Sequence, residues 1–251
     1  MSHLKSKFQF LDAKNHIYLQ EVTSTNTVLK DEKYPAGTCM TAATQTAGRG
    51  RKNHNWEHLG QNLTFSGKIS WQGFSLELPL FSLYMGEAVR NACNKFLGKE
   101  LCQVKWPNDV YCNHKKIAGI LLETSTNGEK YSCIIGVGIN LYSEHIPNDL
   151  PQAACLSNTA LDASQKERLL ASLVEQINSF LALLLDKEDH SHTISRLYKH
   201  SYLKNKEVIT TCNGETVRAK VNGYTPQGFL QISAANSSYE LMDSPEKFEV
   251  C

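Results

Sequence analysis

Short runs of apolar and β-branched residues, separated by polar turns, recur through the first two thirds of the chain. They predict strands at 38–44, 63–70, 103–106, 116–124 and 131–139. Glycine, proline and polar residues break the chain between these runs, and no internal repeat is present. A sheet therefore forms the centre of this part of the molecule.

Two helical patterns accompany the strands. Over 80–97, apolar residues such as Met85, Val89 and Phe96 recur at helical spacing, and Gly98 is a typical C-terminal stop. A second apolar stripe runs to 184, and Ser164 followed by Glu167 predicts a capping box at its start. Both helices are expected to pack on the sheet.

The pattern changes after the second helix. Residues 188–202 are polar and rich in histidine, and from Lys206 onward short strand-like runs are broken by Asn213-Gly214, Asn222-Gly223 and Gln227-Gly228. We therefore predict an α+β domain over 1–200 and a small all-β domain over 202–251.

Composition and charge narrow the class of protein. The chain has 251 residues, of which 41% are hydrophobic and 20% charged, as in ordinary globular proteins. The longest apolar run, 180–185, is far shorter than the roughly 20 residues of a membrane span. The N-terminal residues lack the apolar core of a secretory signal. We expect a cytoplasmic protein with no membrane contact.

Neither the charge nor the cysteines indicate a nucleic-acid or metal-cluster protein. The net charge is +1, and no run of lysine or arginine exceeds two residues, which argues against binding to nucleic acid. The eight cysteines contain no C-x-x-C pair, so they are predicted to be reduced thiols rather than metal ligands.

The segment 45–56, QTAGRGRKNHNW, is the most informative for chemistry. Its glycines permit close approach of the backbone to a ligand, and Arg49 and Arg51 can donate charge-assisted hydrogen bonds to a carboxylate or phosphate. In isolation it could equally be a solvated basic loop. It matches no dinucleotide-binding pattern, because Asn53 stands where the third glycine would be, and no Walker A loop is present.

Three further segments have plain structural explanations when taken singly. Lys105-Trp106-Pro107-Asn108-Asp109 reads as a proline-enforced turn. The lysines that begin KKIAGILLE at 115–123 could be surface residues at the mouth of a strand. The glycines of GVGIN at 136–140 could serve only tight packing.

Taken together and in order, these segments resemble the biotin protein ligases, including the catalytic part of holocarboxylase synthetases. The resemblance covers about residues 18–142 and rests on five motifs. They are EVTSTN at 21–26, GRGR with its following Trp56, KWPND at 105–109, KKIAGILLE at 115–123 and GVGIN at 136–140.

The resemblance implies a mixed sheet with flanking helices, like that of class II aminoacyl-tRNA synthetases, followed by a small SH3-like β-barrel. It implies ATP-dependent formation of biotinyl-5′-AMP and transfer of biotin to a lysine of a biotin carboxyl carrier protein. It assigns biotin binding to Ser24, Thr25, Asn26, Gln45, Arg49, Gly50, Arg51 and Lys116. It assigns ATP binding to Trp56, Lys105, Asn108 and Asn140, with Trp56 against the adenine.

Catalysis is expected from four of the polar residues. Arg49, Arg51 and Lys116, with Mg²⁺ bound together with ATP, would offset the repulsion between the two anionic substrates. Asp109 would orient or deprotonate the acceptor lysine. No residue is assigned as a ligand of Mg²⁺.

The sequence departs from the family pattern at two places. The loop has Lys52, Asn53 and His54 where relatives that read GRGRRGR-x-W have arginine, glycine and arginine, so a titratable histidine replaces an arginine and Asn53 replaces a turn glycine. The basic residue that some members place near the end of the barrel has no counterpart in 244–251, and no site residue is predicted there.

Alternatives remain open at this stage. A lipoate-type ligase shares the fold, a nucleic-acid-binding protein could use the Arg-Gly loop, and a non-catalytic biotin sensor would lack the catalytic residues. About 20 residues precede Ser24, too few for a helix-turn-helix module, so we expect a monofunctional ligase that is a monomer or homodimer.

Overall fold

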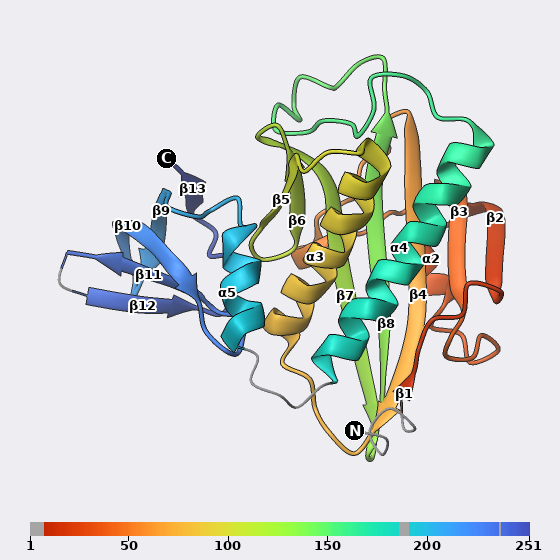
Figure 1. Cartoon of the computed structure of the whole chain (residues 1–251), viewed down its shortest axis with the longest axis horizontal. Coiled ribbons are helices and arrows are strands. Elements are labelled where there is room, and N and C mark those ends of the chain that lie inside the picture. Colours follow the sequence, from red (N-terminus) through yellow and green to blue (C-terminus); the bar gives the residue numbers. More distant parts are fainter. Residues whose placement is uncertain (1–7, 186–190, 236) are drawn as a thin grey trace.

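The computed structural model describes residues 8–185, 191–235 and 237–251, and its centre is an eight-stranded mixed sheet (Figure 1). Seven strands follow the order β2-β3-β4-β8-β7-β6-β5, and β1 pairs with β4. The strands are β1 (Phe8–Gln9), β2 (His16–Val22), β3 (Cys39–Gln45), β4 (Gln61–Gln72), β5 (Cys102–Lys105), β6 (Asp109–Cys112), β7 (Lys115–Asn127) and β8 (Lys130–Tyr142).

The five predicted strands of this sheet are confirmed as β3, β4, β5, β7 and β8, whereas β1, β2 and β6 were not predicted. The strands β2 and β3 pair in parallel, and all other pairs are antiparallel. Long β4, β7 and β8 lie side by side in the middle, and their inward side chains are among the most buried of the described residues.

Helices α3 (Leu78–Leu97) and α4 (Ala163–Leu184) cover one face of the sheet and enclose the main apolar core (Figure 1). Gly98 ends α3 in the left-handed conformation with φ 64°, as predicted. The capping box of α4 lies two residues earlier than predicted: Asp162 accepts from the backbone of Gln165, whose side chain accepts from the N–H of Asp162. Both serine and aspartate suit this position, so the sequence pattern alone did not distinguish them.

The short helix α2 (Thr25–Val28) is packed at the opposite face of the sheet. A second apolar cluster of Leu29, Met40 and Ile134 lies beneath it. This cluster is separate from the core under α3 and α4. It fixes α2 over β3 and β8, and α2 carries two of the predicted biotin-binding residues.

The C-terminal part contains α5 (Ser191–Lys199) and an antiparallel sheet in the order β12-β11-β10-β9-β13. The strands are β9 (Glu207–Cys212), β10 (Glu215–Tyr224), β11 (Leu230–Ala234), β12 (Ser237–Leu241) and β13 (Phe248–Val250). The small β module is confirmed, but the sheet is not a closed barrel, because β12 and β13 form its two edges.

Two of the three predicted breaks in this module are turns. Asn213 and Gly214 have φ 51° and 84° between β9 and β10, as a tight hairpin requires. Gly228, with φ 85°, lies between β10 and β11. Asn222-Gly223 instead lies within β10, where the pairing with β11 shifts register. An Asn-Gly pair suits a bulge as well as a turn.

The two sheets are joined through one backbone segment. Val104 of the edge strand β5 donates to the carbonyl of His200 at 3.1 Å and accepts from the N–H of Tyr202 at 2.8 Å. Beside this segment, Nδ1 of His200 lies 2.5 Å from the buried Glu87 carboxylate of α3. The edge of the large sheet is thus covered by the start of the C-terminal part.

No helix in the described residues is long and apolar enough to cross a membrane. The eight cysteines are free thiols, as predicted.

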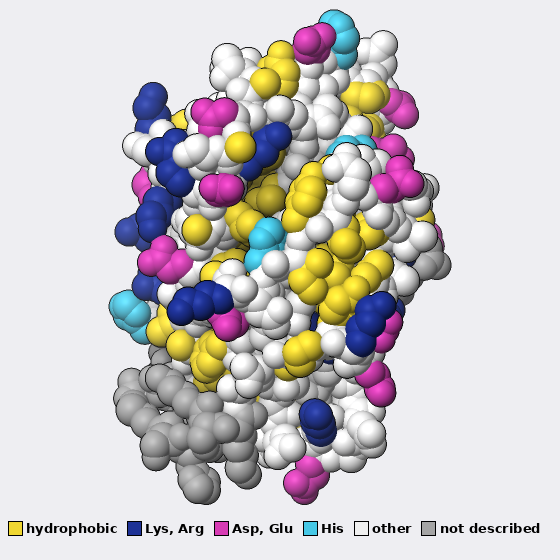
Figure 2. Space-filling model, turned by 90° about the vertical axis from the view of Figure 1, so that its right-hand side faces the viewer, with side chains coloured by type: hydrophobic (Ala, Val, Ile, Leu, Met, Phe, Trp, Pro, Cys, Tyr) yellow, Lys and Arg dark blue, Asp and Glu magenta, His cyan; other side chains and the backbone are white. Residues whose placement is uncertain are grey.

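Figure 2 looks onto the side where β2 forms the edge of the large sheet, and hydrophobic side chains gather there among charged ones. Tyr18 of β2 is 60% exposed.

Candidate active site

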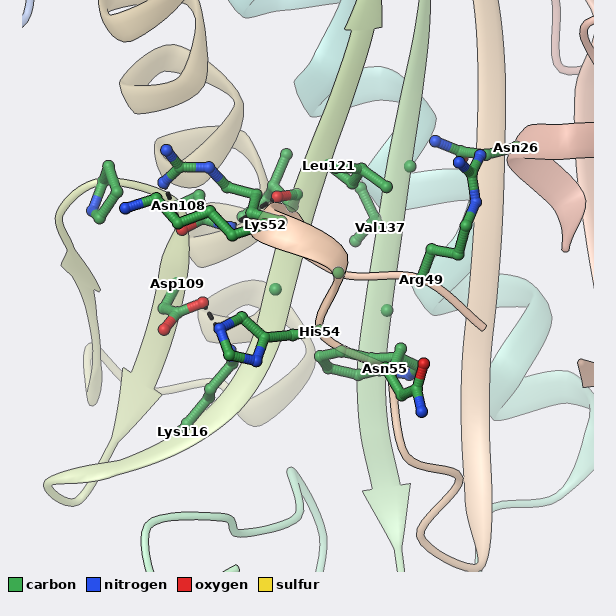
Figure 3. Close-up of a pocket in the computed structure, with 18 of the residues that line it drawn as sticks. Asn26, Arg49, Lys52, His54, Asn55, Asn108, Asp109, Lys116, Leu121 and Val137 are labelled. Carbon is green, nitrogen blue, oxygen red and sulfur yellow. Dashed lines mark hydrogen bonds and ion pairs between the residues drawn. The ribbon is translucent and has the colours of Figure 1, made fainter. Parts of the chain in front are cut away.

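A cavity of about 690 Å³ opens on the face of the large sheet that α3 and α4 leave free (Figure 3). Its walls come from α2, the loop after β3, the turn between β5 and β6, the strands β7 and β8, and the segment between β12 and β13. The structure brings together twelve of the thirteen predicted site residues here, and Asn140 is the one that does not line the cavity. The twelve are Ser24, Thr25, Asn26, Gln45, Arg49, Gly50, Arg51, Trp56, Lys105, Asn108, Asp109 and Lys116.

The end of the cavity next to α2 is held by a network of buried polar groups. Oε1 of Gln45 accepts from the backbone N–H and the hydroxyl of Thr25 at 2.8 and 3.0 Å. The amide of Asn26 donates to Glu123 at 2.9 Å, and Ser66 donates to Oδ1 of Asn26. Such a satisfied network fixes the side chains and so presents a preformed surface to a polar ligand.

The glycines of the GVGIN and KKIAGILLE motifs make room for these side chains. A β-carbon at Gly136 would overlap the amide of Asn26, and one at Gly138 would overlap the indole of Trp56. Gly119 is also packed closely against Trp56. The motif glycines are therefore needed for the cavity itself, beyond tight packing of the strands.

The loop between β3 and β4 folds back on itself as a small hairpin. Trp56 donates its backbone N–H to the carbonyl of Gly48 at 3.0 Å, and Gly50 donates to His54 at 2.7 Å. The left-handed residue of the loop is Lys52, with φ 52°.

Arg49 contacts the carboxylate of Glu123 on β7. The two charged groups lie 2.8 Å apart, and Lys30 lies at the same distance from the other oxygen of Glu123. Burial raises the pKa of Glu123, but hydrogen bonds from Lys30 and Asn26 and the charge of Arg49 outweigh that effect and lower the pKa overall. The sequence reasoning did not identify Glu123, although it is the last residue of the KKIAGILLE motif.

Arg51 contacts the C-terminal part of the chain. One arm donates to Oδ1 of Asn108 at 3.1 Å, and the other pairs with the carboxylate of Asp243, between β12 and β13. Burial raises the pKa of Asp243, but the hydrogen bond and charge of Arg51 outweigh it, so the pKa is lowered. No site residue was predicted in this region, yet Asp243, Ser244 and Glu246 line the cavity.

Lys116 lies at the mouth of β7 with its ammonium 2.7 Å from Oδ1 of Asp109 and 5.7 Å from the ring of Trp56. Its backbone is fixed on both sides, because its N–H donates to Gln152 and its carbonyl accepts from Ala154. The side chain is one third exposed. The backbone of Lys116 is thus held by hydrogen bonds, and its charged ammonium lies in the cavity (Figure 3).

Two predicted ATP-binding residues differ in their setting. Lys105 lies in the cavity wall and donates to the hydroxyl of Tyr111 at 3.1 Å. Asn140 is buried outside the wall, where its amide donates to the carbonyl of Ala154 at 3.1 Å and its own carbonyl accepts from Leu156. In this structure Asn140 holds the segment that also supports Lys116, so its predicted contact with ATP is not made from the cavity wall.

The electrostatics of the cavity follow one pattern. Arg49, Arg51 and Lys116 each pair with a carboxylate of the chain, on Glu123, Asp243 and Asp109 respectively. Three fixed cations around one space can bind substrates that carry several negative charges and can stabilise charge that develops between them. The buried Nε1 of Trp56 has no hydrogen-bond partner among the described residues, which adds a donor on the sheet side.

Comparisons with known proteins place this chain in a family. Residues 17–140 match the model of the biotin/lipoate A/B protein ligase family. The chain is 30% identical over 230 residues to the bifunctional ligase/repressor BirA of Salmonella typhimurium, covering 88% of this chain and 70% of that protein. It is 35% identical over 102 residues to the biotin--[acetyl-CoA-carboxylase] ligase of Paracoccus denitrificans, covering 40% and 42%.

The solved structures agree with the sequence relatives. The biotin protein ligase from Aquifex aeolicus in complex with biotin and ATP superposes with a TM-score of 0.76 at 26% identity, covering 95% of this chain and 99% of that one. A fold shared over nearly the full length of both chains includes the C-terminal sheet as well as the large one. The chain belongs to the biotin/lipoate A/B protein ligase family, on its biotin protein ligase branch.

Proposed function

We propose that the protein is an ATP-dependent biotin protein ligase that forms biotinyl-5′-AMP and transfers the biotinyl group to a lysine of a carrier protein. The observation that carries this proposal is the convergence of Arg49, Arg51 and Lys116 on one cavity. The Aquifex relative binds biotin and ATP with the same fold. The alternative of a lipoate-type ligase is kept as an arm of the experiment below.

In the first half-reaction, an oxygen of the biotin carboxylate attacks the α-phosphorus of ATP, and pyrophosphate leaves with the bonding electrons. Both reactants are anionic, so the reaction needs cations at the point of approach. Lys116 would bridge the carboxylate and the α-phosphate, and Arg49 and Arg51 would close the loop over them. Mg²⁺ enters as part of the ATP substrate, since its phosphates are the usual ligands.

In the second half-reaction, the neutral amine of the acceptor lysine attacks the acyl carbon of the adenylate. An amide bond forms, AMP leaves, and one proton is lost from the nitrogen. Asp109 would orient this amine or accept its proton. Its carboxylate already lies 2.7 Å from Lys116, which supports a position beside the reacting carbon.

The binding residues divide the cavity between the two substrates. Ser24, Thr25, Asn26 and Gln45 would surround biotin at the α2 end, where the network of polar groups is preformed. Trp56, Lys105 and Asn108 would contact ATP, with Asn140 acting from behind the wall. Because biotin is neutral apart from its carboxylate, uncharged hydrogen-bonding groups suit its ring and cations suit its carboxylate.

The acceptor proposed here is a biotin carboxyl carrier protein. The relative from Paracoccus is named as a ligase that joins biotin to acetyl-CoA carboxylase. We also propose that the protein acts in the cytoplasm and without binding nucleic acid, since the net charge of +1 provides no general attraction to it.

The test is direct. The protein is incubated with MgATP, biotin and a biotin carboxyl carrier domain, and mass spectrometry reports the mass added to the carrier. Lipoate in place of biotin, with a lipoyl domain, is run in parallel. Biotin transfer without lipoate transfer supports the proposal. Lipoate transfer alone, or no pyrophosphate release with either acid, would overturn it.

A further inference from the structure

The loop that carries Arg51 is attached to the C-terminal sheet by a residue with no assigned role. Asp243 lies 192 positions from Arg51 in the sequence and pairs with its guanidinium. Lys52, the next residue of the loop, contacts the same segment, because its ammonium donates to the carbonyl of Ser244 and lies 3.6 Å from the Asp243 carboxylate. Two consecutive basic residues thus hold one short segment between β12 and β13.

The residues at both ends of this contact make further hydrogen bonds. Asp243 accepts from the backbone N–H of Ser244 at 2.6 Å. On the other side, Asn108 receives the second arm of Arg51 and is itself tied to β7, since its amide donates to the carbonyl of Ile120 at 2.8 Å. Arg51 therefore bridges the large sheet and the C-terminal sheet.

We infer that Asp243 is a positioning residue that holds Arg51 and Lys52, and with them the loop 48–56, over the cavity before any substrate binds. This inference rests on the proposed function, since the loop it holds is the one that would enclose the adenylate. By keeping the loop closed, Asp243 slows the escape of the reactive intermediate until the carrier lysine arrives.

The alternative is that Asp243 merely occupies the place of a substrate phosphate and competes with it. The number of hydrogen-bond donors on Arg51 favours a positioning role for Asp243. A guanidinium has five N–H donors, and the contacts with Asn108 and Asp243 leave others for an anion in the cavity. Lys52 and the N–H of Ser244 also neutralise Asp243 from outside, so the carboxylate need not leave when a phosphate enters.

The first experiment needs no catalysis. Ligand-free full-length protein is treated with trypsin, which cuts after Arg51 and Lys52, and fragment masses are followed over time. Asp243→Asn is compared with Glu249→Gln, which removes the same charge from an exposed position on β13. We expect cleavage in the loop to rise about two- to fivefold in Asp243→Asn only, the range of a partly exposed ion pair. Asp243→Glu should restore most of the protection.

Salt provides a second route that requires no variant. The ion pair is partly exposed, with 30% of the Arg51 side chain and 43% of the Asp243 side chain accessible. Sodium chloride should therefore speed loop cleavage in the wild type, and cleavage that does not change with salt would count against the ion pair. The comparison also stands if Asp243→Asn folds poorly.

The second experiment measures release of radiolabelled biotinyl-5′-AMP after it is formed on the enzyme. Release should quicken in Asp243→Asn by about the same factor as the cleavage and remain unchanged in Glu249→Gln. Equal cleavage and equal release in Asp243→Asn and wild type would overturn the inference, as would slower release with tighter binding of ATP, the mark of competition. If the wild type forms no adenylate while cleavage still depends on Asp243, the proposed function fails and the attachment of the loop stands.

Discussion

The ammonium of Lys116 and the carboxylate of Asp109 form an ion pair at 2.7 Å, and they come from neighbouring strands, β7 and β6. The same two residues are proposed for different half-reactions, Lys116 for making the adenylate and Asp109 for using it. Because the two side chains form an ion pair, each one helps to hold the charged group of the other in place. Under the proposed function, the anionic adenylate would give Lys116 a second anion to bind and would leave Asp109 more available to the incoming amine.

Removing the lysine should separate catalysis from folding. Lys116→Ala is expected to lower the rate of pyrophosphate release by at least about 10²–10³-fold, because a fixed charge at the reacting atoms is lost. The free energy of unfolding should fall by only about 1–3 kcal/mol, since Asp109 loses a partner at a partly accessible site. Lys115→Ala, at the exposed neighbouring position, is the control. Near-normal pyrophosphate release by Lys116→Ala would remove the residue from the mechanism.

Shortening the arginine of the loop should cause leakage. Arg51→Gly removes the contacts with Asn108 and Asp243 at once, so the loop should enclose the adenylate poorly. We expect release of the intermediate to increase more than its synthesis declines, and biotin to appear on serum albumin as well as on the carrier domain. The measurement is biotin on both proteins beside the release rate. A variant that makes adenylate at a comparable rate and still biotinylates only the carrier would show that this loop is not a lid.

The two glycines of β8 should affect the two substrates differently. Gly136→Ala would displace the amide of Asn26 and is expected to raise the KM for biotin, whereas Gly138→Ala would displace Trp56 and raise the KM for ATP. Each change should be roughly 5- to 100-fold, corresponding to the usual cost of overpacking. Steady-state kinetics with each substrate varied in turn provides the measurement. Each variant is the control for the other, and equal effects on both KM values would contradict the assignment of the two ends.

Acid should weaken the fold partly through Glu123. Its pKa is lowered in the folded protein, so the folded state binds fewer protons than the unfolded state near the ordinary glutamate pKa of about 4.3. The stability it contributes is present above that pH and is lost as the pH falls through the lowered value. The difference in unfolding free energy between wild type and Glu123→Gln should thus be largest above about pH 5 and shrink below about pH 4.

The matched control for this titration is Glu129→Gln, which removes a carboxylate from the exposed turn between β7 and β8. Urea unfolding at several pH values measures both variants against wild type. A difference for Glu123→Gln that does not change between pH 3 and 7 would mean that its ion pairs with Lys30 and Arg49 contribute no stability of their own.

Much of the fold could be predicted because burial leaves a pattern along the chain. The long central strands and α3 are apolar on the face they bury, and Gly98 ends the helix for a backbone reason. The edge strand β2 escaped prediction because only alternate residues are partly buried, and its exposed Tyr18 weakens the contrast. Helix α5 begins in a polar stretch, where its amphipathic face is short.

The site was predicted where its residues lie within motifs and missed where distant segments meet. Lys116, Asp109 and both arginines belong to continuous motifs with chemical meaning. Asp243 could not be found in this way, because a lone aspartate between two short strands has no local signature. The family pattern directs attention to a cation near the C-terminus, whereas the described structure provides an anion that contacts the loop. Only the packing of the two sheets brings residues 51 and 243 together.

The hydrogen bonds of Val104 with His200 and Tyr202 bear on how this protein can be divided. The predicted border between the two domains runs through residues 200–202. Their backbone pairs with β5 and forms the outermost segment at this edge of the large sheet. A truncated protein ending at residue 199 would leave β5 as a bare edge strand, which is a template for association with other chains. Chimaeras made from two ligases should therefore exchange the C-terminal sheet at a point beyond residue 202, so that each large sheet keeps its own border.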